Sequence, residues 1–158
     1  MKNDILAYLA GAIDSDGTIG IKRSTYAMRV TRDSAQPAYS ERMALRQVQR
    51  TIPDLLRRTF GGGLYITKSS ARNGQALWSW SITDRRCAEA LAILLPFLRI
   101  KRAQARNALR LRALKERSKA YRVRSGRGHA GSSPRSARHS TAMEARYLEA
   151  KRLNHVGI

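Results

Sequence analysis

The sequence predicts an α+β fold built on a mostly antiparallel sheet. Apolar residues recur at helical spacing in some segments and alternate with polar residues in others, in the order helix, strand pair, helix, strand pair, helices. Breaks rich in glycine or proline separate these segments, as at Gly61-Gly62-Gly63 and Pro96. A chain of 158 residues is long enough to bury a core and too short for two large domains.

The first helix and the first strand adjoin in the sequence. Asn3 or Asp4 can cap the helix, which is predicted to end near Asp14. From Thr18 to Arg23 the period changes to two, which indicates a half-buried strand whose polar face carries positive charge. The apolar positions of the helix are Ile5, Leu6, Leu9 and Ile13.

The second strand and the middle helix are less regular. Residues 24–39 are polar and basic and contain Pro37, so the start of the second strand stays open, and Met43–Arg50 is assigned to it. Pro53 begins a short helix, because proline is tolerated in the first helical turn, and the glycines at 61–63 end it.

A hairpin and two helices complete the predicted core. The alternation of Trp78, Ser79 and Trp80 is the clearest strand signal, and we expect both tryptophans to pack in the protein. Thr83 can cap the helix that follows. The predicted strands are Leu64–Lys68 and Leu77–Ile82, and the predicted helices are Thr83–Leu95 and Lys101–Lys115.

The C-terminal part differs in composition from the rest. Apolar residues are scarce from Ser118 to Ser140, where arginine, serine and glycine dominate, so this segment is predicted to be a flexible basic arm. We therefore divide the chain into a domain at 1–117, an arm at 118–140 and a helix at 141–158. That last helix docks on the core or follows a phosphate backbone. Met143, Tyr147, Ala150 and Asn154 lie along one stripe of this helix.

The charge of the chain points to a polyanionic partner. Lysine and arginine number 31 against 11 acidic residues, which gives a net charge of +20. Nucleic acid is the simplest such partner, although ribosomal and membrane-surface proteins can be equally basic. Charge alone carries no information about catalysis.

Several classes are excluded by what the sequence lacks. Cys87 is the only cysteine, so neither a disulfide framework nor a thiolate zinc site is available. No apolar run is long enough for a membrane span, and we expect a soluble, intracellular protein without a membrane partner. Gly61-Gly62-Gly63 lacks the lysine and hydroxyl residue of a P-loop, and no small-molecule substrate is expected.

The most informative motif is Leu9–Gly17, in which an apolar helix leads into Asp14, Asp16 and a glycine. An isolated Asp-x-Asp-Gly usually only caps a helix, and a calcium loop is excluded because apolar residues replace its later oxygen ligands. The segment resembles the nine-residue signature of the LAGLIDADG homing endonucleases, from which it differs mainly at Ala12 and Ser15. Residues 18–22 resemble the first DNA-contacting strand of that family.

The resemblance covers about residues 4–115 and implies an αββαββα core that cleaves DNA with a bound Mg²⁺. It implies that Asp16 and the Ser15 carbonyl hold the metal, while Asp14 orders the end of the helix. Pro96–Ala105 is similar to the segment carrying the family's catalytic-site lysine, which Lys101 matches. A cation there can stabilise developing negative charge.

A glutamine near the end of the second strand is the third catalytic residue that the resemblance implies. The register is open: Gln49 is our assignment and Arg50 the alternative, with Gln47 as a base reader. A basic sheet face in the major groove is expected to contact the duplex. The candidate DNA-binding residues are Lys22, Ser24, Arg29, Arg46, Gln47, Lys68 and Arg72.

Small residues at Ala10, Gly11 and Ala12 let another helix approach closely. In the family the motif helices pair, and chains with one motif form homodimers. The resemblance therefore predicts a homodimeric, site-specific nuclease that cuts both strands of a long, pseudo-palindromic duplex and leaves 3′ overhangs. An RNA-splicing maturase and a non-cleaving regulator are the alternatives.

Overall fold

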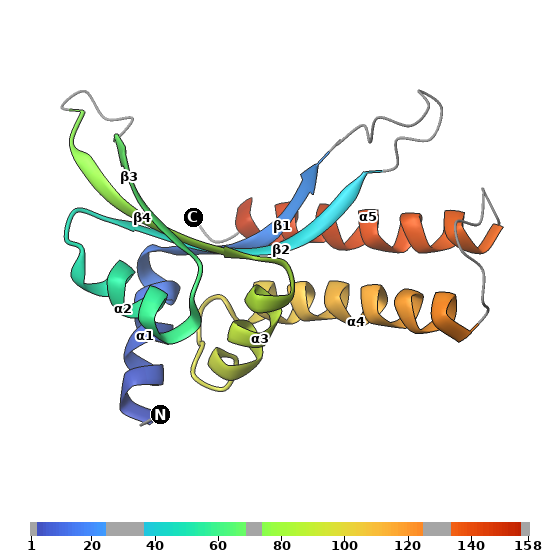
Figure 1. Cartoon of the computed structure of the whole chain (residues 1–158), viewed down its shortest axis with the longest axis horizontal. Helices are drawn as coiled ribbons and strands as arrows, with labels where there is room; N and C mark the ends of the chain where they lie inside the picture. Colours follow the sequence, from blue (N-terminus) through green and yellow to red (C-terminus); the bar gives the residue numbers. More distant parts are fainter. Residues whose placement is uncertain (1–2, 25–36, 69–73, 125–133, 156–158) are drawn as a thin grey trace.

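A four-stranded antiparallel sheet with helices on one face forms the body of the molecule (Figure 1). The computed structural model describes residues 3–24, 37–68, 74–124 and 134–155. The strand order is β1-β2-β4-β3, and the predicted αββαββα core is confirmed. The elements are α1 (Asn3–Asp16), β1 (Gly17–Ser24), β2 (Ala38–Gln47), α2 (Thr51–Phe60), β3 (Gly63–Lys68), β4 (Ala76–Thr83), α3 (Asp84–Leu94), α4 (Arg102–Arg124) and α5 (Pro134–His155).

The two faces of the sheet differ in chemistry because side chains alternate along each strand. Ile19 pairs with Met43, and Leu45 pairs with Trp80, so these residues share the face that α1 to α4 cover. The residues that alternate with them form what we call the open face. Its members in the two first strands are Thr18, Gly20, Lys22, Ser24, Ser40, Arg42, Ala44 and Arg46, and in the other two are Tyr65, Thr67, Ser79 and Ser81.

The hydrophobic core lies between the sheet and the helices. Leu9 and Ile13 of α1 and Trp80 of β4 are fully buried in it. The indole Nε1 of Trp80 donates a hydrogen bond to the Gly61 carbonyl at 2.8 Å, so burial leaves no polar group of this side chain unpaired. Trp78 is half-buried, with the Arg50 guanidinium 4.7 Å from its ring centroid. Trp80 therefore packs in the core as predicted, and Trp78, for which packing was also expected, contacts Arg50.

Several boundaries differ from the predicted ones. α1 continues to Asp16, and β2 begins at Ala38 and ends at Gln47, three residues before the predicted Arg50. The strand ends early because residues 48–50 form a bend and α2 begins at Thr51. Thr83 precedes α3 but its side chain makes no capping hydrogen bond.

Helical structure occupies both ends of the segment that we predicted as a flexible arm, since α4 continues to Arg124 and α5 begins at Pro134. Arginine, lysine and alanine have high helix propensity, which sustains a helix without an apolar stripe. The division of the chain at 117 and 140 stays a prediction. Within the part of the chain that the structure describes, no helix is long and apolar enough to span a bilayer.

α5 docks on the rest of the molecule, which is the first of the two roles that the sequence left open for it. It lies beside the edge strand β1 and along α4 (Figure 1). The predicted stripe makes the contact: Ala150 is buried with Ile21 and Leu111, and Met143 and Tyr147 pack against them. Docking therefore uses a small apolar cluster separate from the main core.

A buried acid joins β2 to α3 and α4. Glu41 is fully buried, and its Oε2 accepts hydrogen bonds from Arg112 at 2.7 Å and Lys115 at 3.3 Å. The same two cations bind Asp84, which adopts a left-handed φ of 58° at the start of α3. Removing one partner of a buried ion pair leaves a poorly compensated charge.

We expect Arg112→Met to lower the free energy of unfolding by about 3 kcal/mol, because the Glu41 carboxylate loses its shortest hydrogen bond in the protein interior. Arg85→Met is the matched control, since Arg85 pairs with Glu89 on the surface, where such a pair contributes about 0.5 kcal/mol. Urea denaturation of both variants measures the difference. Equal losses would contradict the role of the buried cluster.

Candidate active site

The carboxylate of Asp16 is exposed and held in place at the C-terminal end of α1. Gln47 Nε2 donates to Oδ2 at 2.8 Å, and Ser15 Oγ donates to Oδ1 at 3.0 Å. These bonds, that from Gln47 first, stabilise the charged form and lower the pKa of Asp16 below its ordinary value. Asp16 thus presents a fixed, ionised carboxylate to solvent.

Asp14 has a different surrounding, two residues earlier in the same helix. It is buried, and its carboxylate accepts hydrogen bonds from three successive backbone N–H groups, of Arg99 at 2.6 Å, Ile100 at 3.2 Å and Lys101 at 2.8 Å. Asp14 therefore ties the segment before α4 to the end of α1. All its carboxylate contacts are structural.

The Lys101 side chain returns to the same helix end. Its Nζ donates to the carbonyls of Ile13 at 2.9 Å, Asp14 at 2.5 Å and Ser15 at 3.2 Å. The last carbonyls of a helix have no partner within the helix, so they accept such a cation well. Burial lowers the pKa of Lys101, and the charges of Asp14 and Asp16 act against this effect.

The structure corrects the position of the glutamine. Gln47, which the sequence analysis assigns to base reading, lies beside Asp16, whereas Gln49 lies in the bend after β2. Gln47 alternates in step with Leu45, so it points to the helix side of the sheet and not to the open face. Gln49 would follow the same alternation, but β2 ends at Gln47 and residues 48–50 form a bend. Arg50 lies over Trp78 instead.

The candidate DNA-binding residues separate into three groups. Lys22, Ser24 and Arg46 lie on the open face as expected. Gln47 and Lys68 do not lie on that face. Lys68 is four residues after Leu64 in the same strand, so both side chains point to the side of the sheet that faces the core. Arg29 and Arg72 lie outside the described residues.

Sequence reasoning missed Arg42, an exposed residue of the open face that lies in β2 across from Gly20. The signal was present, since Arg42, Ala44 and Arg46 alternate with Met43 and Leu45, but the start of the strand was left open and only Met43–Arg50 was assigned to it. It also missed Lys151 and Asn154 of α5, which line a groove of about 400 Å³ with β1 and β2.

Solved structures resemble this geometry closely enough to name the fold, although no family model and no curated protein matches the sequence. The homing endonuclease I-TnaI superposes with a TM-score of 0.59 at 15% identity, over 98% of this chain and 95% of that one. I-LtrWI, a LAGLIDADG homing endonuclease bound to target DNA, gives 0.53 at 17% identity over 73% of this chain. The chain has the LAGLIDADG homing endonuclease fold.

Two structures of the homing endonuclease I-CvuI on DNA are also similar, with TM-scores of 0.53 and 0.56 and 23% identity. They cover 69% and 72% of this chain. The chain spans 66% and 69% of the length of the two I-CvuI chains and 39% of that of I-LtrWI. Within the LAGLIDADG fold, the motif helix is α1.

The exposed side of α1 is not the one that we predicted. Ala10 is fully buried in the chain's own core, and Ala12 packs against that core, so Ala10 cannot contact another helix. Gly11 is exposed, and a Cβ there would meet no atom within 4 Å. The exposed stripe instead joins Gly11 to Ile5 and Tyr8.

A second hollow of about 640 Å³ adjoins this stripe. Ala7, Gly11 and Asp14 of α1 form one side of it, and the segment that leads into α4 forms the other. Ile100, in that segment, is 71% exposed. The surface around Gly11 is therefore both apolar and open. The lining residues of the second side are Pro96, Phe97, Arg99 and Arg102.

Replacing Gln47 with leucine is expected to raise the pKa of Asp16 toward its ordinary value. The hydrogen bond from Gln47 favours the ionised carboxylate, so its loss favours the protonated form. Gln49→Leu is the matched control and should leave this pKa unchanged. A carboxyl ¹³C titration by NMR measures both, and a shift in the control alone would contradict the register that places Gln47 beside Asp16.

Asp14→Ala and Asp16→Ala are expected to act on different properties. The first leaves three backbone N–H groups unpaired, so the free energy of unfolding should fall by about 3 kcal/mol. The second removes an exposed side chain, and the loss should stay within about 0.5 kcal/mol. Thermal or urea denaturation measures both values. Similar losses in the two variants would contradict the separate roles.

Proposed function

We propose that this chain is a LAGLIDADG homing endonuclease that cuts both strands of a duplex DNA site. One observation carries the proposal: the fold brings Lys101 and Asp16, which are far apart in the sequence, to the same helix end beside a basic sheet face. The solved neighbours bound to DNA support the same substrate.

The donor set at this helix end suits Mg²⁺. Asp16 offers a charged carboxylate, and the Ser15 carbonyl lies next to it, so the available ligands are hard oxygens. Among the described residues no three acidic, histidine or cysteine side chains cluster. Magnesium is usually held by one or two carboxylates and by substrate phosphates, so this single carboxylate fits. When bound there, Mg²⁺ would supply charge neutralisation and Lewis acidity to the phosphodiester.

The other residues have supporting roles in this proposal. Gln47 orients the Asp16 carboxylate through its 2.8 Å hydrogen bond, so the catalytic assignment moves from Gln49 to Gln47. The Lys101 ammonium stabilises negative charge that develops on the phosphate oxygens. Asp14 positions Lys101 by accepting its backbone N–H.

The open face would lie in the major groove of the DNA, where base pairs present distinct patterns of donors and acceptors. Lys22, Ser24, Arg42 and Arg46 are the residues placed to contact base edges or phosphates there. The proposed site is long and pseudo-palindromic, and cleavage leaves 3′ overhangs. Arg29, Lys68 and Arg72 stay proposals for further contacts with the DNA.

A homodimer would complete the site, because one chain supplies one Asp16 and a duplex has two strands. The exposed stripe of α1 is suited to pairing with its copy, since Gly11 allows close approach and Ile5 and Tyr8 supply apolar surface. This face replaces the predicted set of Ala10, Gly11 and Ala12.

The experiment that tests the proposed function selects bound duplexes from a random library and incubates them with Mg²⁺. The native protein should cut both strands. Asp16→Asn should bind the same duplexes and cut them at least about a thousandfold more slowly, because the metal ligand is lost. Asp4→Asn, at an exposed acid of the same helix, is the matched control.

Each other outcome has a defined meaning. Equal cutting by the native protein and Asp16→Asn would reject Asp16 as the metal ligand. Specific binding without cutting by either protein would favour a regulator or a maturase, and cutting that persists with a chelator present would reject the need for a metal.

The homodimer is tested by Gly11→Leu, which should raise the dissociation constant of the dimer at least about tenfold because a side chain then separates the two helices. Ala103→Leu places the same side chain at an exposed position of α4 and should have little effect. Analytical ultracentrifugation measures both. A dimer that tolerates leucine at position 11, or a native chain that stays monomeric, would contradict the proposed face.

A further inference from the structure

Helix α5 forms a second wall beside the open face of the sheet. The groove between them, which we name the β1–α5 groove, has a volume of about 400 Å³. Asp16 lines it together with residues of β1 and β2 on one side and of α5 on the other. Its lining residues are Asp16, Thr18, Gly20, Ile21, Lys22, Arg42, Ala44, Leu45, Arg46, Ala150, Lys151 and Asn154.

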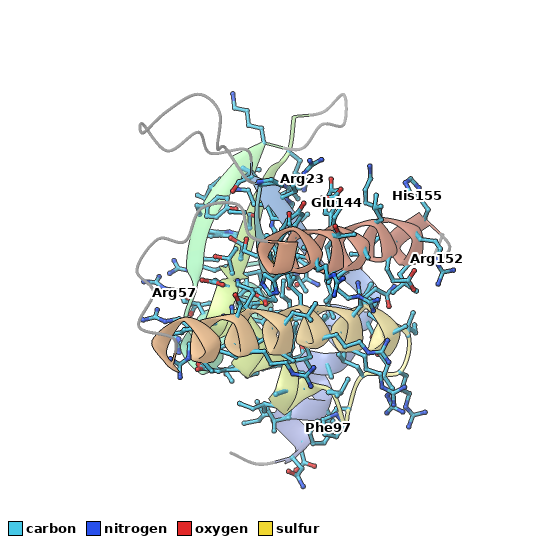
Figure 2. The ribbon with its side chains drawn as sticks, turned by 90° about the vertical axis from the view of Figure 1, so that its right-hand side faces the viewer. Arg23, Arg57, Phe97, Glu144, Arg152 and His155 are labelled. Atoms are coloured by element: carbon cyan, nitrogen blue, oxygen red, sulfur yellow. The ribbon has the colours of Figure 1, made fainter. Side chains whose placement is uncertain are left out.

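The position of α5 against the sheet is fixed at several points. Gln104 and Asn107 of α4 donate to the carbonyls of Leu153 at 3.2 Å and Arg146 at 2.8 Å. Glu144, in the middle of α5, pairs with Arg23 of β1 at 3.6 Å (Figure 2). The last turn of α5 therefore stays beside β1.

Gly20 permits this close approach. A Cβ at position 20 would lie 3.3 Å from Asn154 Nδ2, which is tighter than ordinary contact. Asn154 thus reaches the open face itself rather than the covered face. The absence of a side chain at Gly20 leaves room for the groove.

The groove is strongly positive. Lys22, Arg42, Arg46 and Lys151 all line it, and none of these four forms an ion pair with a described residue. Asp16 is the single acid in the lining. By contrast, Arg152, the next residue of α5, is paired with Glu149 at 2.8 Å.

We propose that the β1–α5 groove binds the sugar-phosphate backbone of the duplex, with Lys151 and Asn154 as phosphate contacts. This inference rests on the proposed function. A sheet in the major groove turns its edge strands toward the phosphates that border the groove, and β1 is such an edge. α5 lies along that edge, so its polar side chains face the backbone and not the bases.

The groove also relates this contact to cleavage, because Asp16 lines it too. A DNA backbone bound by Lys151 would therefore continue along the groove toward the Asp16 carboxylate. Lys151 is then a positioning residue: its ammonium lies 5.8 Å from the centroid of the Tyr147 ring, which restricts where it can point. Phosphate contacts of this kind fix register and carry no sequence preference.

The test compares Lys151→Gln with Arg152→Gln in the full chain, on duplexes selected by the native protein. Both variants remove one positive charge from neighbouring positions, but only Lys151 lines the groove. We expect the plot of log K against log salt to become shallower by about 0.9 per subunit of the bound dimer for Lys151→Gln and to change little for Arg152→Gln. Base preference, measured by repeating the selection, should stay the same in both.

A second variant, Asn154→Asp, places a negative charge where the phosphate is expected. Binding should weaken at low salt and recover toward the native value at high salt, where the repulsion is screened. Circular dichroism and the urea midpoint show whether α5 stays folded. A loss of binding that does not depend on salt would overturn the phosphate contact.

The remaining outcomes separate this inference from the proposed function. Native binding and cutting with an unchanged salt slope in Lys151→Gln would overturn the groove and leave the nuclease intact. A native chain that neither binds nor cuts any duplex would overturn both. If Lys151→Gln weakened the binding of RNA but not of duplex DNA, the duplex contact would be overturned and RNA would be identified as the occupant of the groove.

Discussion

The reciprocal contact between the end of α1 and the segment before α4 is the interaction on which the rest of the site depends. The Asp14 carboxylate accepts from the backbone of residues 99–101, and the Lys101 ammonium donates to the carbonyls of residues 13–15. Each partner satisfies polar groups that the other element leaves unpaired. This contact fixes the position of Asp16 at the end of α1, and therefore the position of the whole site.

The second constraint is the division of the sheet into two faces. The apolar residues of the strands pack against the helices, so the remaining residues form the open face, which includes Arg42, Arg46 and Lys22. With a net charge of +20, such a chain repels itself unless anions are near. These basic side chains lie beside Asp16 and have no acidic partner among the described residues, so they are suited to bind the phosphates of a phosphodiester substrate.

Much of this arrangement follows from the sequence. Periodicity was sufficient for the order of elements. The resemblances at Leu9–Gly17 and Pro96–Ala105 led to Asp16 and Lys101, which the structure brings to one helix end. The position of the glutamine was not accessible in this way, because it depends on where β2 ends, and the bend before α2 sets that end. Gln49 lies in that bend, so Gln47 lies beside Asp16 in its place. Ala10 lies in the core and not in the expected helix contact, because residue size alone does not reveal which side of a helix faces the core.

The contribution of α5 was the least predictable. Its apolar stripe was visible, but the surface that it covers belongs to β1 and α4, far away in the sequence. Gly20, a small residue in a strand, indicates a close approach only once the partner Asn154 is known. Tertiary contacts of this kind are decided by shape, and local sequence patterns do not contain them.

In the function proposed above, Asp16 and Lys101 act as one unit at the end of α1. This is tested by a double-mutant cycle on the single-turnover cleavage rate, with Asp16→Asn, Lys101→Met and the double variant. Residues that act as a unit are strongly non-additive, so the double variant should lose about as much rate as the worse single variant. Losses that multiply would show that the two residues act independently, which would contradict a shared site.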